Sequence, residues 1–189
     1  MSDYAQNFIA YLQGLKEDKK EKKSGALAHL RRSLGFEPGC YTPAFPYVER
    51  FVAEDKHSQD ASRQALYLVA GLFALHPKQG SKSLAAAFGA LMRERDSASI
   101  EQRFIALLGA DTQNLPDYLR QTISLLRADE RALDYAALLD DMSRWLNPRI
   151  DPKWRDEIRR DWARDFYRAV TEASPATDAA SESVSTSIE

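Results

Sequence analysis

Residues 99–146 read SIEQRFIALLGADTQNLPDYLRQTISLLRADERALDYAALLDDMSRWL and contain three consecutive segments with helical spacing of apolar residues. Short polar breaks separate the segments, and Pro116 occupies the first turn of the second one. The apolar stripes comprise Ile100, Phe104, Leu107 and Leu108, then Leu119, Ile123 and Leu126, then Tyr135, Leu138, Leu139, Met142 and Trp145. The stretch therefore predicts helices that pack side by side through these faces.

The remaining segments repeat this pattern, and the predicted fold class is all-α, with about nine helices packed as helical bundles. Residues 60–75 are apolar on most sides, which predicts the helix at the centre of the core. Residues 151–170 carry an aromatic and aliphatic stripe with a four-residue repeat, more typical of a core or a subunit contact than of a cofactor site. This stripe comprises Trp154, Ile158, Trp162, Phe166 and Val170.

Polar residues indicate where helices begin and how the chain divides. Capping-box patterns predict helix starts at Asp3, with Gln6 as its partner, and at Ser99, with Gln102. The predicted division is an N-terminal helical part over 1–76, a linker over 77–82, a C-terminal helical bundle over 83–170 and a disordered acidic tail over 171–189.

Composition restricts the cellular setting. No window approaches the roughly 18 apolar residues of a membrane span, and the N-terminal charges follow the apolar part, unlike a secretory signal. Cys40 is the single cysteine, which fits a reducing compartment, so a cytoplasmic protein is expected. Net charge is −2, but residues 171–189 hold four acids and no base, leaving 26 bases against 24 acids in residues 1–170. Any nucleic-acid contact must then come from locally clustered bases.

No constellation for catalysis or metal binding is visible, so no enzyme activity, cofactor or metal is expected. The three histidines, His29, His57 and His76, are far apart and lack ligand-spaced partners. Asp161 and Asp165 share a helix face, but arginines on the same face would neutralise them. No recognition helix, zinc finger or aromatic stacking motif is apparent either. Nucleic acid, if bound, should be held through its backbone without base reading.

Several segments, in their order, carry a family resemblance: ALAHLRRSLG, TPAFPYVERFV, SLAAAFGALM, SIEQRFIALLGAD, LPDYLRQTISLL, LDYAALLDDMSRW and WARDFYRAV. Together, over about residues 27–170, they resemble the CasB family, the small subunit of the type I-E CRISPR Cascade surveillance complex. The resemblance implies a non-catalytic subunit of a ribonucleoprotein in antiviral defence. It further implies two copies in tandem that contact the backbone and large subunits of a guide-RNA complex and hold the target and displaced DNA strands of the R-loop.

The resemblance also implies basic residues for phosphate contact. The matching positions are Arg31 and Arg32 in LRRSLG, Arg103 in EQRF and Arg120 in LPDYLRQ, where Gln121 departs from a more basic pattern. Expected exposure adds Lys82, Arg127 and Arg144. Arg31 and Arg32 could equally favour the helix dipole or form surface salt bridges.

Two alternatives stay open from the sequence. One is a purely structural helical adaptor whose bases meet acidic protein partners. The other is an unrelated helical regulator, which would not associate with CRISPR complex subunits.

Overall fold

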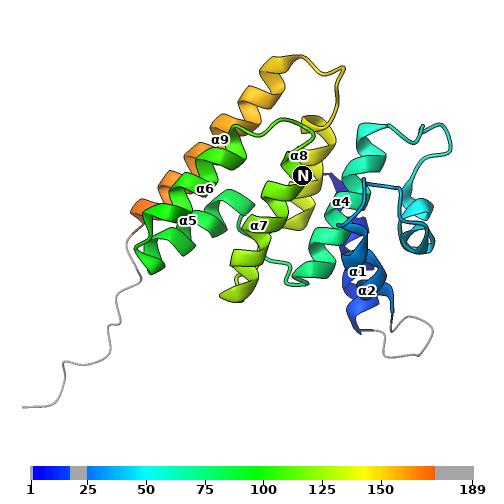
Figure 1. Ribbon diagram of the computed structural model, residues 1–189, viewed down its shortest axis with the longest axis horizontal. Coiled ribbons are helices and arrows are strands. Elements are labelled where there is room, and N and C mark those ends of the chain that lie inside the picture. Colours follow the sequence, from blue (N-terminus) through cyan, green and yellow to red (C-terminus); the bar gives the residue numbers. More distant parts are fainter. Residues whose placement is uncertain (1, 18–24, 173–189) are drawn as a thin grey trace, which may run out of the picture.

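The computed structural model describes residues 2–17 and 25–172, and the predicted disordered tail lies almost entirely outside them. Within these ranges the chain forms nine α-helices and two short 3-10 helices and no strand, which confirms the all-α fold class (Figure 1). In chain order they are α1 (Asp3–Glu17), α2 (Ala26–Ser33), η1 (Thr42–Ala44), α3 (Phe45–Val48), η2 (Glu49–Phe51), α4 (Ala61–Leu75), α5 (Leu84–Arg95), α6 (Ala98–Leu108), α7 (Leu115–Ala128), α8 (Tyr135–Trp145) and α9 (Pro152–Thr171).

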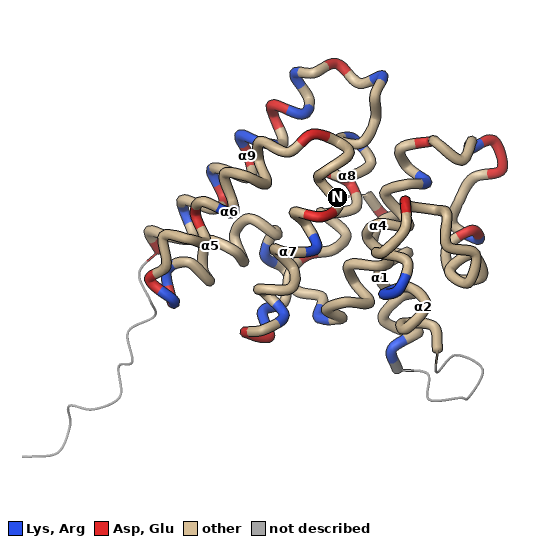
Figure 2. The backbone as a smooth tube through the Cα atoms, in the orientation of Figure 1, with Lys and Arg blue, Asp and Glu red and all other residues tan. Residues whose placement is uncertain are grey.

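Helix α4 lies at the centre of the core, as its apolar sequence predicted. All ten residues from 65 to 74 are buried, and Figure 2 draws the helix almost without charged positions. Asp60 caps its N-terminus, with the side chain accepting a hydrogen bond from the Ser62 amide at 2.9 Å. Helices α2, α7 and α8 pack around it. This arrangement buries α4 on most sides.

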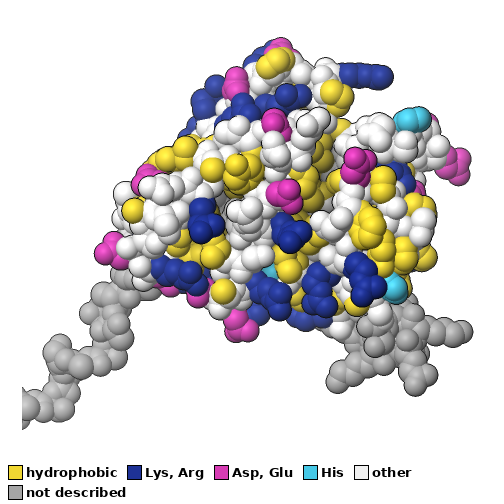
Figure 3. All heavy atoms as spheres, in the orientation of Figure 1, with side chains coloured by type: hydrophobic (Ala, Val, Ile, Leu, Met, Phe, Trp, Pro, Cys, Tyr) yellow, Lys and Arg dark blue, Asp and Glu magenta, His cyan; other side chains and the backbone are white. Residues whose placement is uncertain are grey.

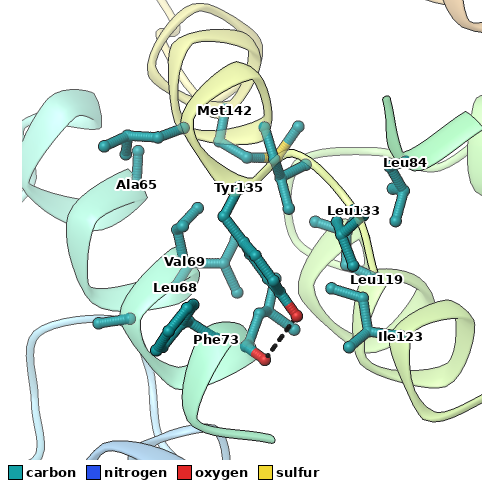
Figure 4. Close-up of a cluster of buried hydrophobic side chains, with 14 of the residues drawn as sticks. Ala65, Leu68, Val69, Phe73, Leu84, Leu119, Ile123, Leu133, Tyr135 and Met142 are labelled. Atoms are coloured by element: carbon teal, nitrogen blue, oxygen red, sulfur yellow. Dashed lines mark hydrogen bonds between the residues drawn. The ribbon is translucent and has the colours of Figure 1, made fainter. Parts of the chain in front are cut away.

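The segment between α4 and α5 is hydrogen-bonded to the turn before α8. The Gly80 amide donates to the Leu133 carbonyl at 2.8 Å, and the Asp134 amide donates to the Lys82 carbonyl at 2.7 Å. The Tyr135 hydroxyl donates to the His76 carbonyl at 2.7 Å, and Figure 4 shows its ring reaching from α8 toward Phe73 of α4. Residues of the predicted linker are therefore held against α8. The division of the chain into two helical units stays a prediction.

Helices α5 and α9 approach each other closely because α5 carries small residues. A Cβ atom added at Gly89 would lie 2.3 Å from the carbonyl oxygen of Phe166. The rings of Phe104 of α6 and Phe166 of α9 stack with centroids 4.0 Å apart. Helices α5, α6 and α9 thus form one layer, on the left of Figure 1.

Both predicted capping boxes are wrong. Helix α6 begins at Ala98 after Ser97, so Ser99 lies inside the helix. In α1 the Ser2 hydroxyl accepts from the Ala5 amide at 3.3 Å, while Asp3 is already helical. The aromatic stripe of α9 is confirmed only in part, because Ile158, Trp162 and Phe166 are buried whereas Trp154 is 42% exposed.

Helices α8 and α9 meet around a partly buried acid, Asp141. The Trp162 indole N–H donates to the Asp141 carboxylate at 2.7 Å, and the Trp145 and Trp162 rings lie 5.4 Å apart. Burial raises the pKa of Asp141 to about 6, although the Trp162 hydrogen bond and the Arg144 charge act in the opposite direction. The native state therefore binds a proton here more tightly than the unfolded chain does, and ionisation opposes folding.

Replacing Gly89 should test the close α5–α9 contact. We expect Gly89→Ala to lower the free energy of unfolding by about 1–3 kcal/mol, because its Cβ would meet backbone atoms that cannot rotate away. Gly14→Ala is the matched control, since nothing lies within 4 Å of its added Cβ and alanine favours a helix by about 0.5–1 kcal/mol. Urea unfolding of both variants measures this, and equal effects would contradict the packing argument.

Asp141→Asn should change stability in a pH-dependent way. Asparagine keeps an acceptor for the Trp162 N–H but carries no charge. Because the Asp141 pKa is raised from about 3.9 in unfolded chains to about 6, wild-type stability declines between these values as pH rises. The variant should therefore be more stable than wild type by about 2 kcal/mol at pH 7.5 and equal to it near pH 4. Denaturant unfolding at both pH values tests this, and a pH-independent difference would count against it.

Candidate nucleic-acid interface

All seven basic residues predicted for phosphate contact have exposed side chains. They are Arg31 and Arg32 on α2, Lys82 before α5, Arg103 on α6, Arg120 and Arg127 on α7, and Arg144 on α8. None of them forms an ion pair with another residue that the structure describes. By contrast, several other arginines are paired at short distance, such as Arg95 with Asp129 at 2.7 Å. The charges of the seven are thus available to a partner.

Two arginines project from the last turn of α2. The amides after the helix fold back, with Leu34 donating to the Arg31 carbonyl at 3.3 Å and Gly35 to the Arg32 carbonyl at 3.1 Å. This tight turn ends the helix and satisfies its carbonyls through the backbone, so neither guanidinium is needed as a cap. Both side chains are consequently exposed at one end of α2.

Helix α7 presents two arginines on one face. Arg120 and Arg127 are seven residues apart, about 10 Å along the helix, and the buried seam of Leu119, Ile123 and Leu126 lies beside them. Arg103 approaches from α6 and lines a small hollow together with Gln121 and other residues of α7. Gln121, where the sequence departs from the more basic family pattern, therefore lies near the predicted basic residue Arg103.

Two lysines outside the predicted set lie close together in the structure. An open hollow of about 260 Å³ between α1 and the α4–α5 segment is lined by Lys16 and Lys78, among others. The Lys16 ammonium donates to the Pro77 carbonyl at 3.1 Å, whereas Lys78 pairs with Glu130 at 3.1 Å. Lys16 is not among the residues predicted from the sequence, because only the fold brings α1 beside residue 77.

His76 lies close to two cationic side chains, those of Lys78 and Arg127. Its ring is buried, and Nε2 is 2.6 Å from the carbonyl oxygen of Arg131. Burial lowers the pKa of His76, and the charges of Lys78 and Arg127 act in the same direction, against the effect of the Arg131 hydrogen bond. The ring is therefore neutral at pH 7, and its role here is structural, anchoring the end of α4 to the turn after α7.

Arg144 is separated from the other predicted residues. It lies in the last turn of α8, whereas Lys82 is hydrogen-bonded through its carbonyl to Asp134 at the helix start, about 15 Å away along the axis. Its charge also acts on the partly buried Asp141. The structure therefore does not bring Arg144 close to Lys82.

Figure 3 shows several basic side chains in a row across the lower part of one face, from the region of α5 past the end of α7 to α1 and α2. Helix α9 differs, because Figure 2 shows basic and acidic positions alternating along it. Ion pairs within α9, such as Arg164 with Asp161 at 2.9 Å, neutralise part of this charge locally. The predicted basic residues on α2, α6 and α7, by contrast, have no ion pair with a described residue.

Metal binding and membrane insertion have no counterpart among the described residues. Within residues 2–17 and 25–172, no three His, Cys, Asp or Glu side chains gather as metal ligands would. In the same ranges, none of the helices has both the length and the apolar character needed to cross a membrane.

Comparison with known proteins gives a family match over most of the chain. Residues 26–167 match the family model of the CRISPR-associated protein Cse2. A CRISPR-associated protein Cse2 from Thermus thermophilus is 39% identical over 166 residues, which cover 87% of this chain and 90% of the relative.

Solved structures agree as well. The crystal structure of CasB from Thermus thermophilus superposes with a TM-score of 0.72 at 39% identity, covering 89% of this chain and 99% of that one. A chain of a CRISPR RNA-guided surveillance complex shares the fold, with a TM-score of 0.71 at 23% identity over 88% of this chain and 93% of that one. The family match over most of the chain, the level of identity and the shared helical fold show that this chain belongs to the Cse2 family, whose members are also named CasB.

Proposed function

We propose that this chain is a non-catalytic subunit of an RNA-guided CRISPR surveillance complex, in which it holds the target and displaced DNA strands of the R-loop. In this proposal its other surfaces contact the backbone and large subunits and a second copy of the chain. The observation that supports this proposal most directly is a set of exposed basic residues on α2, α6 and α7. These residues have no ion pairs with described residues. Membership of the Cse2 family supports it.

The chemistry of these residues suits phosphate. A guanidinium stays charged at any physiological pH and offers forked N–H donors to phosphate oxygens. Because the arginines lack acidic partners among the described residues, a phosphate would not have to displace one. Such contacts fix a strand in position without reading its bases, and guide pairing would supply the sequence specificity.

The balance of charge predicts weak binding by the free chain. Net charge is −2 over the whole sequence, so attraction to DNA depends on the local group of bases and not on overall charge. A few phosphate contacts on each subunit gain strength when a strand is already held nearby by the rest of a complex. This fits an accessory role in a larger assembly.

In the adaptor alternative, the same basic side chains contact acidic protein partners. It predicts that reversing their charge disrupts assembly of the complex while the remaining DNA affinity is unchanged. The phosphate proposal predicts the opposite pattern, with assembly kept and the R-loop weakened.

Removing four of the arginines should weaken the binding of single-stranded DNA and make it less sensitive to salt. For Arg31→Ala, Arg32→Ala, Arg103→Ala and Arg120→Ala combined, we expect the slope of log affinity against log salt to become shallower by about 0.7 for each phosphate that is no longer bound. Fluorescence anisotropy of a labelled oligonucleotide, titrated at several salt concentrations, measures the slope.

A matched control removes four bases that are ion-paired in the structure: Lys56, Arg95, Lys153 and Arg164. This quadruple alanine variant has the same net charge as the test variant, so an effect of overall charge would appear in both. An equal decrease in the two variants would contradict a localised interface.

The same two variants, assembled into a reconstituted complex, separate the proposal from the adaptor alternative. We expect the test variant to assemble normally and to shorten the lifetime of the R-loop, with little change for the control. Failure of the test variant to assemble would favour the adaptor. Normal assembly with an unchanged lifetime would reject the phosphate role.

A further inference from the structure

Three aromatic side chains, from α2 and the loop after it, gather near the C-terminal end of α2. The rings of Phe36 and Tyr41 stack with centroids 4.8 Å apart and planes 29° from parallel, and the His29 ring lies 6.4 Å from that of Tyr41. Phe36 is 51% exposed, one of five large hydrophobic side chains with high exposure among the described residues. We call Phe36, Tyr41 and His29 the aromatic platform.

The loop that carries this platform is firmly held. Gly39 adopts a φ of +85°, and a Cβ there would lie 2.3 Å from Nη1 of Arg63, so the loop backbone lies directly on this buried side chain. Arg63 in turn pairs with Glu49, whose carboxylate also accepts from the Tyr67 hydroxyl at 2.6 Å. The guanidinium lies 4.9 Å from the centre of the Tyr67 ring. The exposed Phe36 side chain is therefore carried by a loop whose backbone is held in place.

The positive charges of Arg31 and Arg32, next to the platform, indicate what kind of ligand it binds. Phe36 follows Arg32 by four residues, and its amide donates to the Ser33 carbonyl at 3.0 Å, so the ring leaves the turn that directly follows the one carrying the two arginines. Both arginines are exposed and have no ion pair with a described residue. Figure 3 shows hydrophobic, histidine and basic side chains side by side over the region of α1 and α2.

We propose that the aromatic platform stacks against a base of single-stranded DNA whose phosphates are held by Arg31 and Arg32. This rests on the proposed function and adds to it a contact to the bases themselves. Flat rings beside cationic groups are the combination with which proteins hold unpaired strands, since every base offers a π-face and every nucleotide a phosphate. A duplex would not satisfy the platform, because its bases are already stacked.

Photochemical cross-linking tests the contact directly. The full chain is assembled into a reconstituted complex bound to target DNA in which 5-iodouracil replaces the thymines of the displaced strand or of the target strand beyond the guide pairing. Irradiation should attach the DNA to an aromatic ring of the platform. Trypsin, which cleaves after Arg32 and Arg50, should then release the adduct in the peptide of residues 33–50 or, for His29, in the peptide that ends at Arg31.

Phe36→Leu tests the energetic role, because leucine keeps an apolar side chain but offers no flat ring. We expect R-loop lifetime to fall roughly tenfold, the effect of removing one stacked base. Trp154→Leu is the matched control, an exposed aromatic side chain on α9 outside the platform, and should leave the lifetime unchanged.

The outcomes separate this inference from the function on which it rests. No adduct in either peptide, together with an unchanged lifetime for Phe36→Leu, overturns base stacking, and a shorter lifetime for Arg31→Ala with Arg32→Ala would still support phosphate binding. Failure of Phe36→Leu to assemble, without any adduct, would assign the platform to a protein partner and also overturn the inference. No effect of either the platform or the arginine variants would reject both.

Discussion

Helix α4 cannot be stable unless other helices surround it, and the rest of the structure depends on this requirement. Its residues 65–74 are buried in succession, so it has no face to offer to water over most of its length. Helices α2, α7 and α8 satisfy the requirement, and the hydrogen bonds of His76 and Tyr135 fix where α4 ends relative to α8. The helices that carry the candidate interface are therefore those that cover α4 or, like α6, pack against α7.

The distribution of acids explains how a chain with a net charge of −2 has a basic surface. Many carboxylates are already engaged: Asp60 and Asp134 cap helices, Glu49 pairs with buried Arg63, and Asp161 pairs within α9. The arginines on α2, α6 and α7 have no such partners among the described residues. Overall charge is thus a poor guide to this surface, since what matters is which charges remain unneutralised.

The sequence allowed prediction of most helices, because apolar periodicity and the proline and aspartate signals at helix starts are local properties. Pro116 lies in the first turn of α7 as predicted, and Asp134 and Asp151 cap α8 and α9. The capping boxes failed because several polar residues compete at a helix start, and Ser97 and Ser2 precede the residues that the pattern favoured.

The candidate site was less predictable. Exposure of the seven bases follows from helical periodicity, but the approach of Lys16 to the α4–α5 segment depends on contacts between residues about 60 positions apart. The aromatic platform was missed for a similar reason, since Phe36 and Tyr41 are separated by a proline and a glycine in a loop with no regular spacing. Only the folded loop shows that their rings stack.

The buried Arg63 gives this loop an importance beyond its own contacts. Burying a guanidinium is costly unless it is paired, and here Glu49 and Tyr67 complete the pairing. Burial alone would raise the pKa of Glu49, yet the hydrogen bonds from Tyr67 and Arg63 hold it below its ordinary value, so the acid remains ionised and the pair stays intact near neutral pH. A purely apolar contact could support the loop as well, but it would not fix its orientation through directed hydrogen bonds. The network therefore makes most physical sense if the orientation of the loop matters, as it does for a ring that must meet a base while neighbouring arginines meet its phosphates.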